Sequence, residues 1–144
     1  NGIITKPLQP AFLARPASQQ NNFAVGSDVT IVFGTEIFDQ NGDFASNTFT
    51  APVTGKYQLQ TTLRVQTLDS ASAYYYMQIV TSNRSYIYII DPDFGQDNAY
   101  LPFQLSVLAD MDASDTAIVQ IYQANGATQT DINTASSFSG YLVA

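Results

Sequence analysis

The acidic side chains of this sequence gather in two short segments, and their spacing is the first feature that could support chemistry. Residues 91–97 read DPDFGQD and residues 110–115 read DMDASD. Carboxylate oxygens at alternating positions suit Ca²⁺, a hard cation that prefers oxygen ligands. The weak calcium candidates in these segments are Asp91, Asp93, Asp97, Asp110, Asp112 and Asp115.

Neither acidic segment matches the calcium loop of helix–loop–helix proteins. In the first segment Gly95 comes one position early, and Gln96 stands where that loop needs glycine. In the second, Asp115 stands at the glycine position, and Ile121 replaces the closing glutamate. We therefore expect solvated loop carboxylates, with no bound metal or cofactor, and keep calcium as the alternative.

The sequence lacks the side chains on which most enzymatic mechanisms depend. It contains no His and no Cys, so the commonest general base and the thiolate nucleophile are missing. It also has no Gly-x-Ser-x-Gly elbow and no glycine-rich phosphate loop. A polysaccharide hydrolase would need two carboxylates across a cleft, but among twelve acids some pair will be close by chance. We expect no enzymatic activity and keep a hydrolase as the least favoured function.

The charge balance excludes several partners. Five Lys and Arg stand against twelve Asp and Glu, which gives a formal net charge of −7. Such a chain repels a phosphate backbone and has no basic patch for an anionic membrane, so we expect no nucleic-acid partner. No apolar run approaches the roughly 18 residues of a membrane span, so we expect no membrane insertion.

The pattern around these segments is that of an all-β protein. Short stretches alternate apolar and polar residues, and no stretch has apolar residues at helical spacing. Asn41-Gly42 predicts a tight turn, because both residues tolerate positive φ. We expect one domain over residues 10–144 and an extended lead-in, the end of a stalk or linker, over residues 1–9. The chain starts with Asn1 rather than Met, and we expect a mature or excised part of a longer protein.

The segment around Pro52 predicts a corner followed by a central strand. Pro52 cannot donate a hydrogen bond to a neighbouring strand, so it belongs at a bend or an edge. Gly55 is expected to adopt a backbone conformation that other residues resist. Strict alternation then begins at Tyr57.

Three strands carry apolar or aromatic residues on both faces. A two-layer sandwich buries only its inner face, so the outer face should be polar. Apolar side chains on that second face predict an oligomer interface. The interface candidates are Tyr74, Tyr76, Ile87, Ile89, Ile118 and Tyr122.

A set of spaced residues in the middle of the chain points to a family. In order, these residues are Phe33, Asp39, Phe44, Phe49, Gly55, Tyr57 and Leu59. Their order and near-spacing resemble the signature of the C1q domain, part of the C1q/tumour-necrosis-factor jelly-roll superfamily. Phe49 comes two residues sooner than the family pattern expects, Leu59 replaces the usual Phe and Thr61 replaces an aromatic residue. These changes concern the packing near one strand.

The two ends of the domain strengthen the resemblance. PAFLA at residues 10–14 resembles the family's first strand, and SSFSGYLV at residues 136–143, with Phe138 and Gly140, resembles its last. The resemblance implies a ten-stranded antiparallel jelly-roll sandwich that forms a homotrimer. Such heads usually cap a fibrous stalk and bind protein or carbohydrate.

The composition of the sequence and one of its segments are similar to those of C1q-like modules of bacteriophages or bacteria. The zero Cys count, the many Asn, Gln, Ser and Thr residues and the phrase DFASNTFTAPVTGKYQ carry this similarity. We expect a trimeric recognition or adhesion head of a phage tail fibre or other virion-surface protein, outside the cell, that binds a host-surface protein or carbohydrate. The alternative is a purely structural trimerisation domain. Binding residues are expected in loops 91–100 and 124–136. The alternative is that these loops only connect strands.

Overall fold

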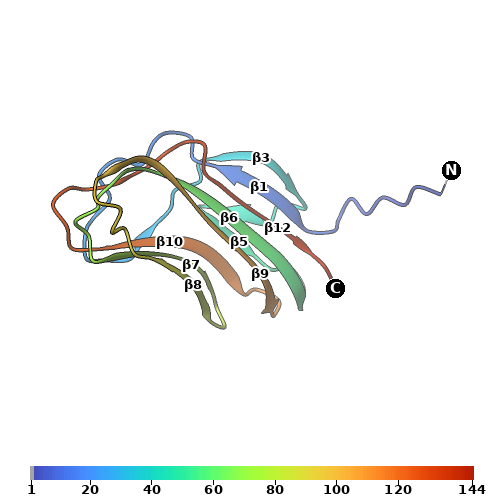
Figure 1. Ribbon diagram of the computed structural model, residues 1–144. Coiled ribbons are helices and arrows are strands. Elements are labelled where there is room, and N and C mark those ends of the chain that lie inside the picture. Colours follow the sequence, from blue (N-terminus) through green and yellow to red (C-terminus); the bar gives the residue numbers. More distant parts are fainter. Residues whose placement is uncertain (1) are drawn as a thin grey trace.

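The computed structural model describes residues 2–144, and in that range the chain forms twelve strands and no helix (Figure 1). The strands are β1 (Ala11–Arg15), β2 (Val29–Thr30), β3 (Thr35–Gln40), β4 (Phe44–Ala45), β5 (Thr48–Thr50), β6 (Gly55–Leu68), β7 (Tyr74–Thr81), β8 (Ser85–Ile90), β9 (Asn98–Met111), β10 (Thr116–Ala124), β11 (Asp131–Ile132) and β12 (Ser137–Leu142). No helix able to cross a lipid bilayer occurs among these residues.

The strands form two antiparallel six-stranded sheets that face each other. In the first sheet, β6 pairs with β9 along one edge and with β12 and then β11 along its other edge, and β12 continues to β1 and β3. The second has the order β4-β5-β10-β7-β8, with β2 also paired to β10. The predicted antiparallel jelly-roll sandwich is therefore confirmed. The strand number is twelve rather than ten, and three of the twelve (β2, β4 and β11) are only two residues long.

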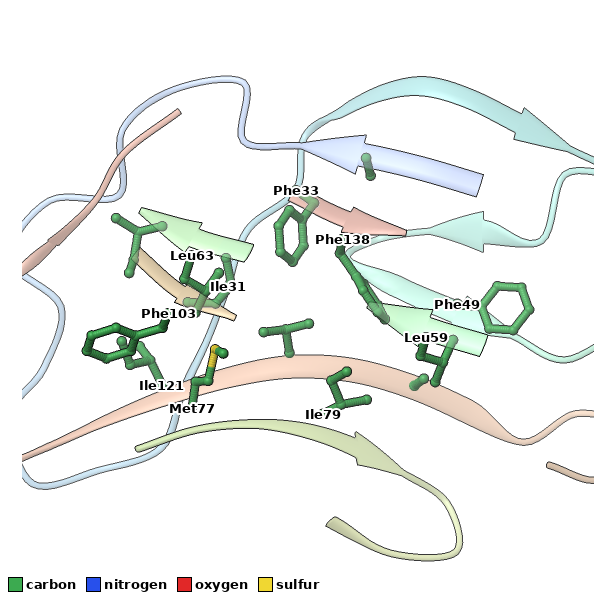
Figure 2. Packing of buried hydrophobic residues seen from close by; sticks show 14 of the residues in the cluster. Ile31, Phe33, Phe49, Leu59, Leu63, Met77, Ile79, Phe103, Ile121 and Phe138 are labelled. Atoms are coloured by element: carbon green, nitrogen blue, oxygen red, sulfur yellow. The ribbon is translucent and has the colours of Figure 1, made fainter. Parts of the chain in front are cut away.

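The core lies between the two sheets, and strict alternation fills it. On β6 the side chains of Tyr57, Leu59, Leu63 and Val65 are fully buried, while those of Gln58, Gln60, Thr62 and Arg64 point outward. Side chains from both sheets point toward one another across the gap (Figure 2). Thr61 shares the buried face, and its hydroxyl donates a hydrogen bond to the carbonyl of Ser137 at 2.9 Å. This bond satisfies a polar group where the family pattern has an aromatic residue.

A group of phenylalanines closes the sandwich at the half of the core that β1 and β12 cover. The Phe12 ring stacks on Phe44 and Phe49 with centroids 5.0 and 4.8 Å away. The edge of the Phe138 ring meets Phe12 at a centroid distance of 5.0 Å. Stacked and edge-to-face pairs are the favoured arrangements of aromatic rings. The group therefore ties β1 and β12 of the first sheet to β4 and β5 of the second.

The predicted tight turn at Asn41-Gly42 is confirmed, and it passes the chain between the sheets. Asn41 and Gly42 have φ angles of 83° and 73°. The Asp39 carboxylate accepts hydrogen bonds from the backbone N–H groups of Asp43 and Phe44, both at 3.0 Å. The strand before the turn pairs in the first sheet, and the strand after it pairs in the second.

Gly55 is required for a different reason from the one that the sequence predicts. Its φ is not in the positive range, so an unusual backbone conformation is not the cause. A Cβ at Gly55 would lie 2.6 Å from the carbonyl oxygen of Ala144 and 2.7 Å from Leu142 Cδ1. Gly140 is similarly enclosed, since a Cβ there would lie 2.7 Å from Leu59 Cδ2. Both glycines serve close strand packing.

The two ends of the sandwich differ in what they carry (Figure 1). Residues 2–10 and the end of β12 lie together at one end, which we call the terminal end. There the Gln9 side chain donates to the carbonyl of Leu142 at 2.7 Å. The β6–β7, β8–β9 and β10–β11 connections gather at the opposite end, which we call the loop end.

Candidate functional site

A polar cleft of about 550 Å³ opens at the loop end, and we call it the apical cleft. Both loops in which the sequence predicts binding residues, 91–100 and 124–136, contribute side chains to it. The 16–28 connection and the end of β6 complete it, and neither was predicted. The cleft is lined by Asn22, Thr67, Asp97, Asn98, Ala99, Thr128, Gln129 and Asp131.

The two carboxylates of the apical cleft are held by hydrogen bonds from neighbouring segments. Asp97 accepts from the backbone N–H and the hydroxyl of Ser70, at 2.8 and 2.7 Å. These bonds lower the pKa of Asp97, so this carboxyl is ionised at neutral pH. Asp131 accepts from the backbone N–H of Asn22 at 2.7 Å. The cleft therefore presents positioned acceptors beside the amide groups of Asn98 and Gln129.

Two residues of the apical cleft adopt unusual backbone conformations. Thr67 and Asn22 have φ angles of 56° and 51°. Asn tolerates this region, but for a β-branched residue it is strained by about 1–3 kcal/mol. The Thr67 hydroxyl donates to the carbonyl of Gln66 at 2.6 Å. Strain of this kind gathers at binding sites, and its position here agrees with a binding role for the cleft.

A buried hydrogen-bond network centred on Asp69, whose exposed fraction is 1%, holds the loop that carries Thr128 of the cleft. The carboxylate accepts from the N–H groups of Ala71, Ala127 and Thr128, at 2.9, 2.5 and 2.8 Å. The backbone N–H of Asp69 donates to the Tyr75 hydroxyl at 3.0 Å. The 124–136 loop is therefore fixed on the sandwich before any ligand arrives.

A second layer of the same network supports the loop from within the sandwich. The Tyr75 hydroxyl lies 2.6 Å from the Thr130 hydroxyl, which donates to the Gln123 side chain at 3.0 Å. Gln123 in turn donates to the carbonyl of Thr128 at 2.7 Å. Burial raises the pKa of Tyr75, so its hydroxyl stays protonated and can donate.

The six weak calcium candidates do not converge. The 91–97 segment lies in the β8–β9 connection, while the 110–115 segment covers the end of β9 and the β9–β10 turn toward the terminal end. Asp110 pairs with Arg84 at 2.8 Å, and Asp115 accepts from the backbone N–H of Asp112 at 2.8 Å. Asp91 accepts from the N–H of Asp93 at 3.2 Å. Within residues 2–144 no three acidic side chains come together as a metal-binding group.

The predicted interface residues lie on the outer face of the second sheet. Tyr76 is directly opposite Tyr122 on β10 and Ile89 on β8, so these side chains share a face. Ile87 and Ile89 on the edge strand have exposed fractions of 52% and 64%. The remaining candidates on this face are Tyr74 and Ile118.

The outer face of the first sheet carries a second apolar group, which was not predicted from the sequence. Phe38, Tyr141 and Leu108 have exposed fractions of 50%, 51% and 55%. Tyr141 and Leu108 both lie opposite Gln58, so they point to the same side of the sheet. The signal was present in the alternation of β12, where Tyr141 stands between buried Gly140 and half-buried Leu142.

The signature residues lie in the core or at the turns that shape it. Phe33, Phe44, Phe49, Tyr57, Leu59 and Phe138 have exposed fractions of at most 3%. Gly140 is buried between β6 and β1, Gly55 packs against the C-terminal segment, and Asp39 caps the turn at Asn41. These residues position the site and do not line it.

Comparison with solved structures defines the class of the protein. The globular domain of the zebrafish complement 1qA protein superposes with a TM-score of 0.67 at 16% identity, covering 94% of this chain and 98% of that one. Murine APRIL, in a crystal structure at pH 8.0, superposes with a TM-score of 0.67 at 10% identity, covering 94% and 99%. The fold is therefore a C1q/TNF-like jelly roll.

The sequence assigns the family. The profile of the C1q domain matches residues 11–143, so the chain belongs to the C1q domain family. Among curated proteins, no sequence matches the chain. Domains of the C1q and TNF families typically form homotrimers, act outside cells and bind receptors or ligands rather than catalyse reactions.

Proposed function

We propose that this domain is the trimeric recognition head of a fibre-like protein on a virion, such as a phage tail fibre, and that it binds a host-surface protein or carbohydrate through the apical cleft. The observation that carries the proposal is that the terminal end lies opposite the loop end (Figure 1), and that loops 91–100 and 124–136, which gather at the loop end, line the apical cleft. A stalk joined at the terminal end directs the cleft away from the fibre. The assignment to a phage protein rests on the similarity of the composition and of residues 43–58 to C1q-like phage modules.

The chemistry of the apical cleft suits a ligand rich in hydroxyl and amide groups. Asp97 and Asp131 supply fixed acceptors, and Asn98 supplies a donor and an acceptor. Gln129 donates its amide hydrogens to the carbonyls of Asn22 and Phe23 and offers its amide oxygen as an acceptor. The Asp69 network holds the loop in place, so little ordering entropy is lost on binding. Each cleft would bind weakly, and three symmetric copies would bind together more strongly.

A closed ring of three chains needs two different surfaces that fit each other on each chain. The chain offers two separate apolar groups, namely Ile87 and Ile89 on the edge strand β8 and the Phe38, Tyr141 and Leu108 group on the first sheet. We propose that the β8 edge of one copy packs against the first-sheet face of the next. This arrangement keeps only two of the predicted interface residues in the contact and leaves the tyrosines free.

Hydrolysis is not favoured by the site. A glycosidase needs one carboxyl group with a raised pKa as the general acid. The hydrogen bonds from Ser70 lower the pKa of Asp97, which is opposite to that requirement. The cleft therefore fits binding without cleavage.

The test is binding of the fluorescently labelled chain to a panel of bacterial strains and to an array of bacterial surface glycans. We expect the wild-type chain to bind a subset of the panel, and the double variant Asp97→Asn/Asp131→Asn to lose at least about tenfold in affinity. Asp93→Asn, an exposed acid outside the cleft, is the matched control. A trimer that binds no member of either panel would overturn the recognition role and favour a purely structural domain.

A further inference from the structure

Three tyrosines form a cluster on the outer face of the second sheet, and we call Tyr74, Tyr76 and Tyr122 the tyrosine cluster. The Tyr76 and Tyr122 rings are parallel within 5°, with centroids 4.9 Å apart. Tyr74 lies 5.9 Å from Tyr122 and 6.4 Å from Tyr76, at interplanar angles of 22° and 17°. The three rings are therefore stacked on one another, and Tyr74, with an exposed fraction of 40%, is the most exposed of them.

A carboxylate contacts the tyrosine cluster. Asp28 comes from the connection before β2, and the Tyr76 hydroxyl donates a hydrogen bond to its Oδ1. Burial and this carboxylate together raise the pKa of Tyr76 to about 12, so the ring stays neutral at physiological pH. Asp28 keeps its other oxygen for a ligand. No Lys or Arg occurs on any strand of the second sheet, so the sheet itself supplies no cation.

We propose that the tyrosine cluster and Asp28 form a binding site for a quaternary ammonium group of the choline type, carried by a polymer on the host surface. The proposal rests on the recognition role proposed above and names one chemical group of the ligand. Aromatic ring faces attract organic cations through their quadrupole, and a neighbouring carboxylate adds a direct charge interaction. The net charge of −7 favours the approach of a cation to the whole domain.

Charge complementarity favours a cation over a second copy of this chain. A chain–chain contact over the tyrosine cluster would bury the Asp28 carboxylate, and interface centres are depleted of charged residues. The interior of the face is also polar, because Gln78 donates to Gln120 at 2.9 Å and Gln120 donates to Thr30 at 3.3 Å. Such a surface meets a small cation without leaving a buried charge unpaired.

The position of the site favours a polymer over a lipid bilayer. The tyrosine cluster lies on the outer face of the second sheet beside the loop end, because Tyr74 begins β7 and pairs with Ala124 at the end of β10. A planar membrane that meets the loop end of a head on a stalk would lie across the end of this face rather than against it. A chain-like polymer can reach along the side of the head. We therefore assign the ammonium group to a flexible surface polymer.

The experiment is an NMR titration of the tyrosine ring resonances with choline chloride. Its matched probe is 3,3-dimethyl-1-butanol, the neutral compound of the same shape. We expect choline to shift the resonances of the tyrosine cluster in a saturable way and the neutral probe to shift them at least about fivefold less at equal concentration. Asp28→Asn and Tyr122→Leu should each weaken choline binding by about fivefold or more.

The controls are Tyr141→Leu, an exposed tyrosine on the other sheet, and Asp93→Asn, an exposed acid at the loop end. Neither should change choline binding. Equal shifts with both probes, or no saturable shift with choline, would overturn the proposal. A change of solution mass in Tyr122→Leu would also overturn it and would assign the cluster to an interface between copies.

A second arm separates the two carriers of the group. The chain should bind choline-substituted dextran beads, and free choline should release it, while phosphatidylcholine vesicles should not retain it. Retention by vesicles alone would contradict the polymer assignment. If the chain binds host cells through the apical cleft while choline has no effect, the recognition role stands and this inference fails.

Discussion

Asp69 is buried, and its carboxylate accepts hydrogen bonds from three backbone N–H groups, one of them that of Thr128 in the apical cleft. Asp69→Asn replaces one acceptor oxygen by an amide group that points at an N–H donor. We expect a loss of about 1–3 kcal/mol in the free energy of unfolding, because a buried donor is left without a partner. Urea denaturation measures it, and Asp112→Asn, on an exposed turn, is the control. Equal stability of both variants would show that the network is dispensable.

The raised pKa of Tyr76 predicts that the free energy of unfolding decreases at alkaline pH. Its pKa is raised to about 12 in the folded chain, above the value for an unfolded chain, so folding retains the proton. The resulting stability is complete below the unfolded pKa of about 10 and is lost as pH rises toward 12. We expect the free energy of unfolding to fall between those values, and less steeply in Tyr76→Phe. Identical slopes in both proteins would contradict the Asp28 contact.

The cleft residues that sequence reasoning missed carry no local signal. Thr67 adopts a positive φ one residue before β6 ends, and a β-branched residue gives no hint of that conformation. Asn22 joins the cleft through a contact 109 residues away in the sequence. The two loops were predictable, because they are long and polar. Their convergence was not, since it depends on which strands are neighbours.

At the scale of strands, alternation predicted the inner faces well. Tyr75, Met77 and Ile79 share one predicted face, and all three are fully buried. The stretch from Val29 to Phe33 alternates apolar and polar residues in part, but only Val29 and Thr30 form a regular strand. The last backbone hydrogen bond of this stretch to β10 is donated by Ile31 to the carbonyl of Val119. Beyond it, the N–H of Val32 donates to the Gln20 side chain and that of Phe33 to the Asn47 side chain. Side-chain acceptors had replaced the neighbouring strand, and an apolar pattern does not report such competition.

Gly140 tests how closely β12 packs between β1 and β6. A Cβ there would lie 2.7 Å from Leu59 Cδ2, 2.9 Å from Phe12 Cε1 and 3.0 Å from the carbonyl oxygen of Gln58. We expect Gly140→Ala to lower the free energy of unfolding by about 1–3 kcal/mol, because the backbone contact cannot give way. Thermal and urea unfolding both measure this loss. Gly2→Ala, which meets nothing within 4 Å, should leave stability unchanged.

At the scale of the whole molecule, the proposed trimer is built from a head with distinct ends. The terminal end and the apical cleft lie at opposite ends of the sandwich, and the tyrosine cluster lies on the outer face of the second sheet, where Tyr76 is directly opposite Ile89 of the proposed contact. The edge strand β8 carries the most exposed of the predicted interface side chains, Ile89, with an exposed fraction of 64%. Exposed apolar groups of this kind on an edge strand invite association.

Ile87→Lys/Ile89→Lys tests the proposed contact. The two lysines add six charges to the trimer, and burying these charges in the interface would strip them of water at a high cost in free energy. We therefore expect the trimer to dissociate to a folded monomer. Circular dichroism should show unchanged β structure, and the solution mass should fall to that of one chain. Ile118→Lys, on the same sheet but away from the edge, is the control. Dissociation by the control alone would move the interface to the centre of the sheet.

The solution mass of the wild-type chain tests the central claim most directly. Light scattering, over a range of concentrations and with and without EDTA, should give roughly three times the chain mass of 15.7 kDa. A trimer in both conditions agrees with the proposed head. A trimer that is lost in EDTA would return the aspartate segments to the role of calcium ligands. A monomer at every concentration would contradict the trimeric recognition head.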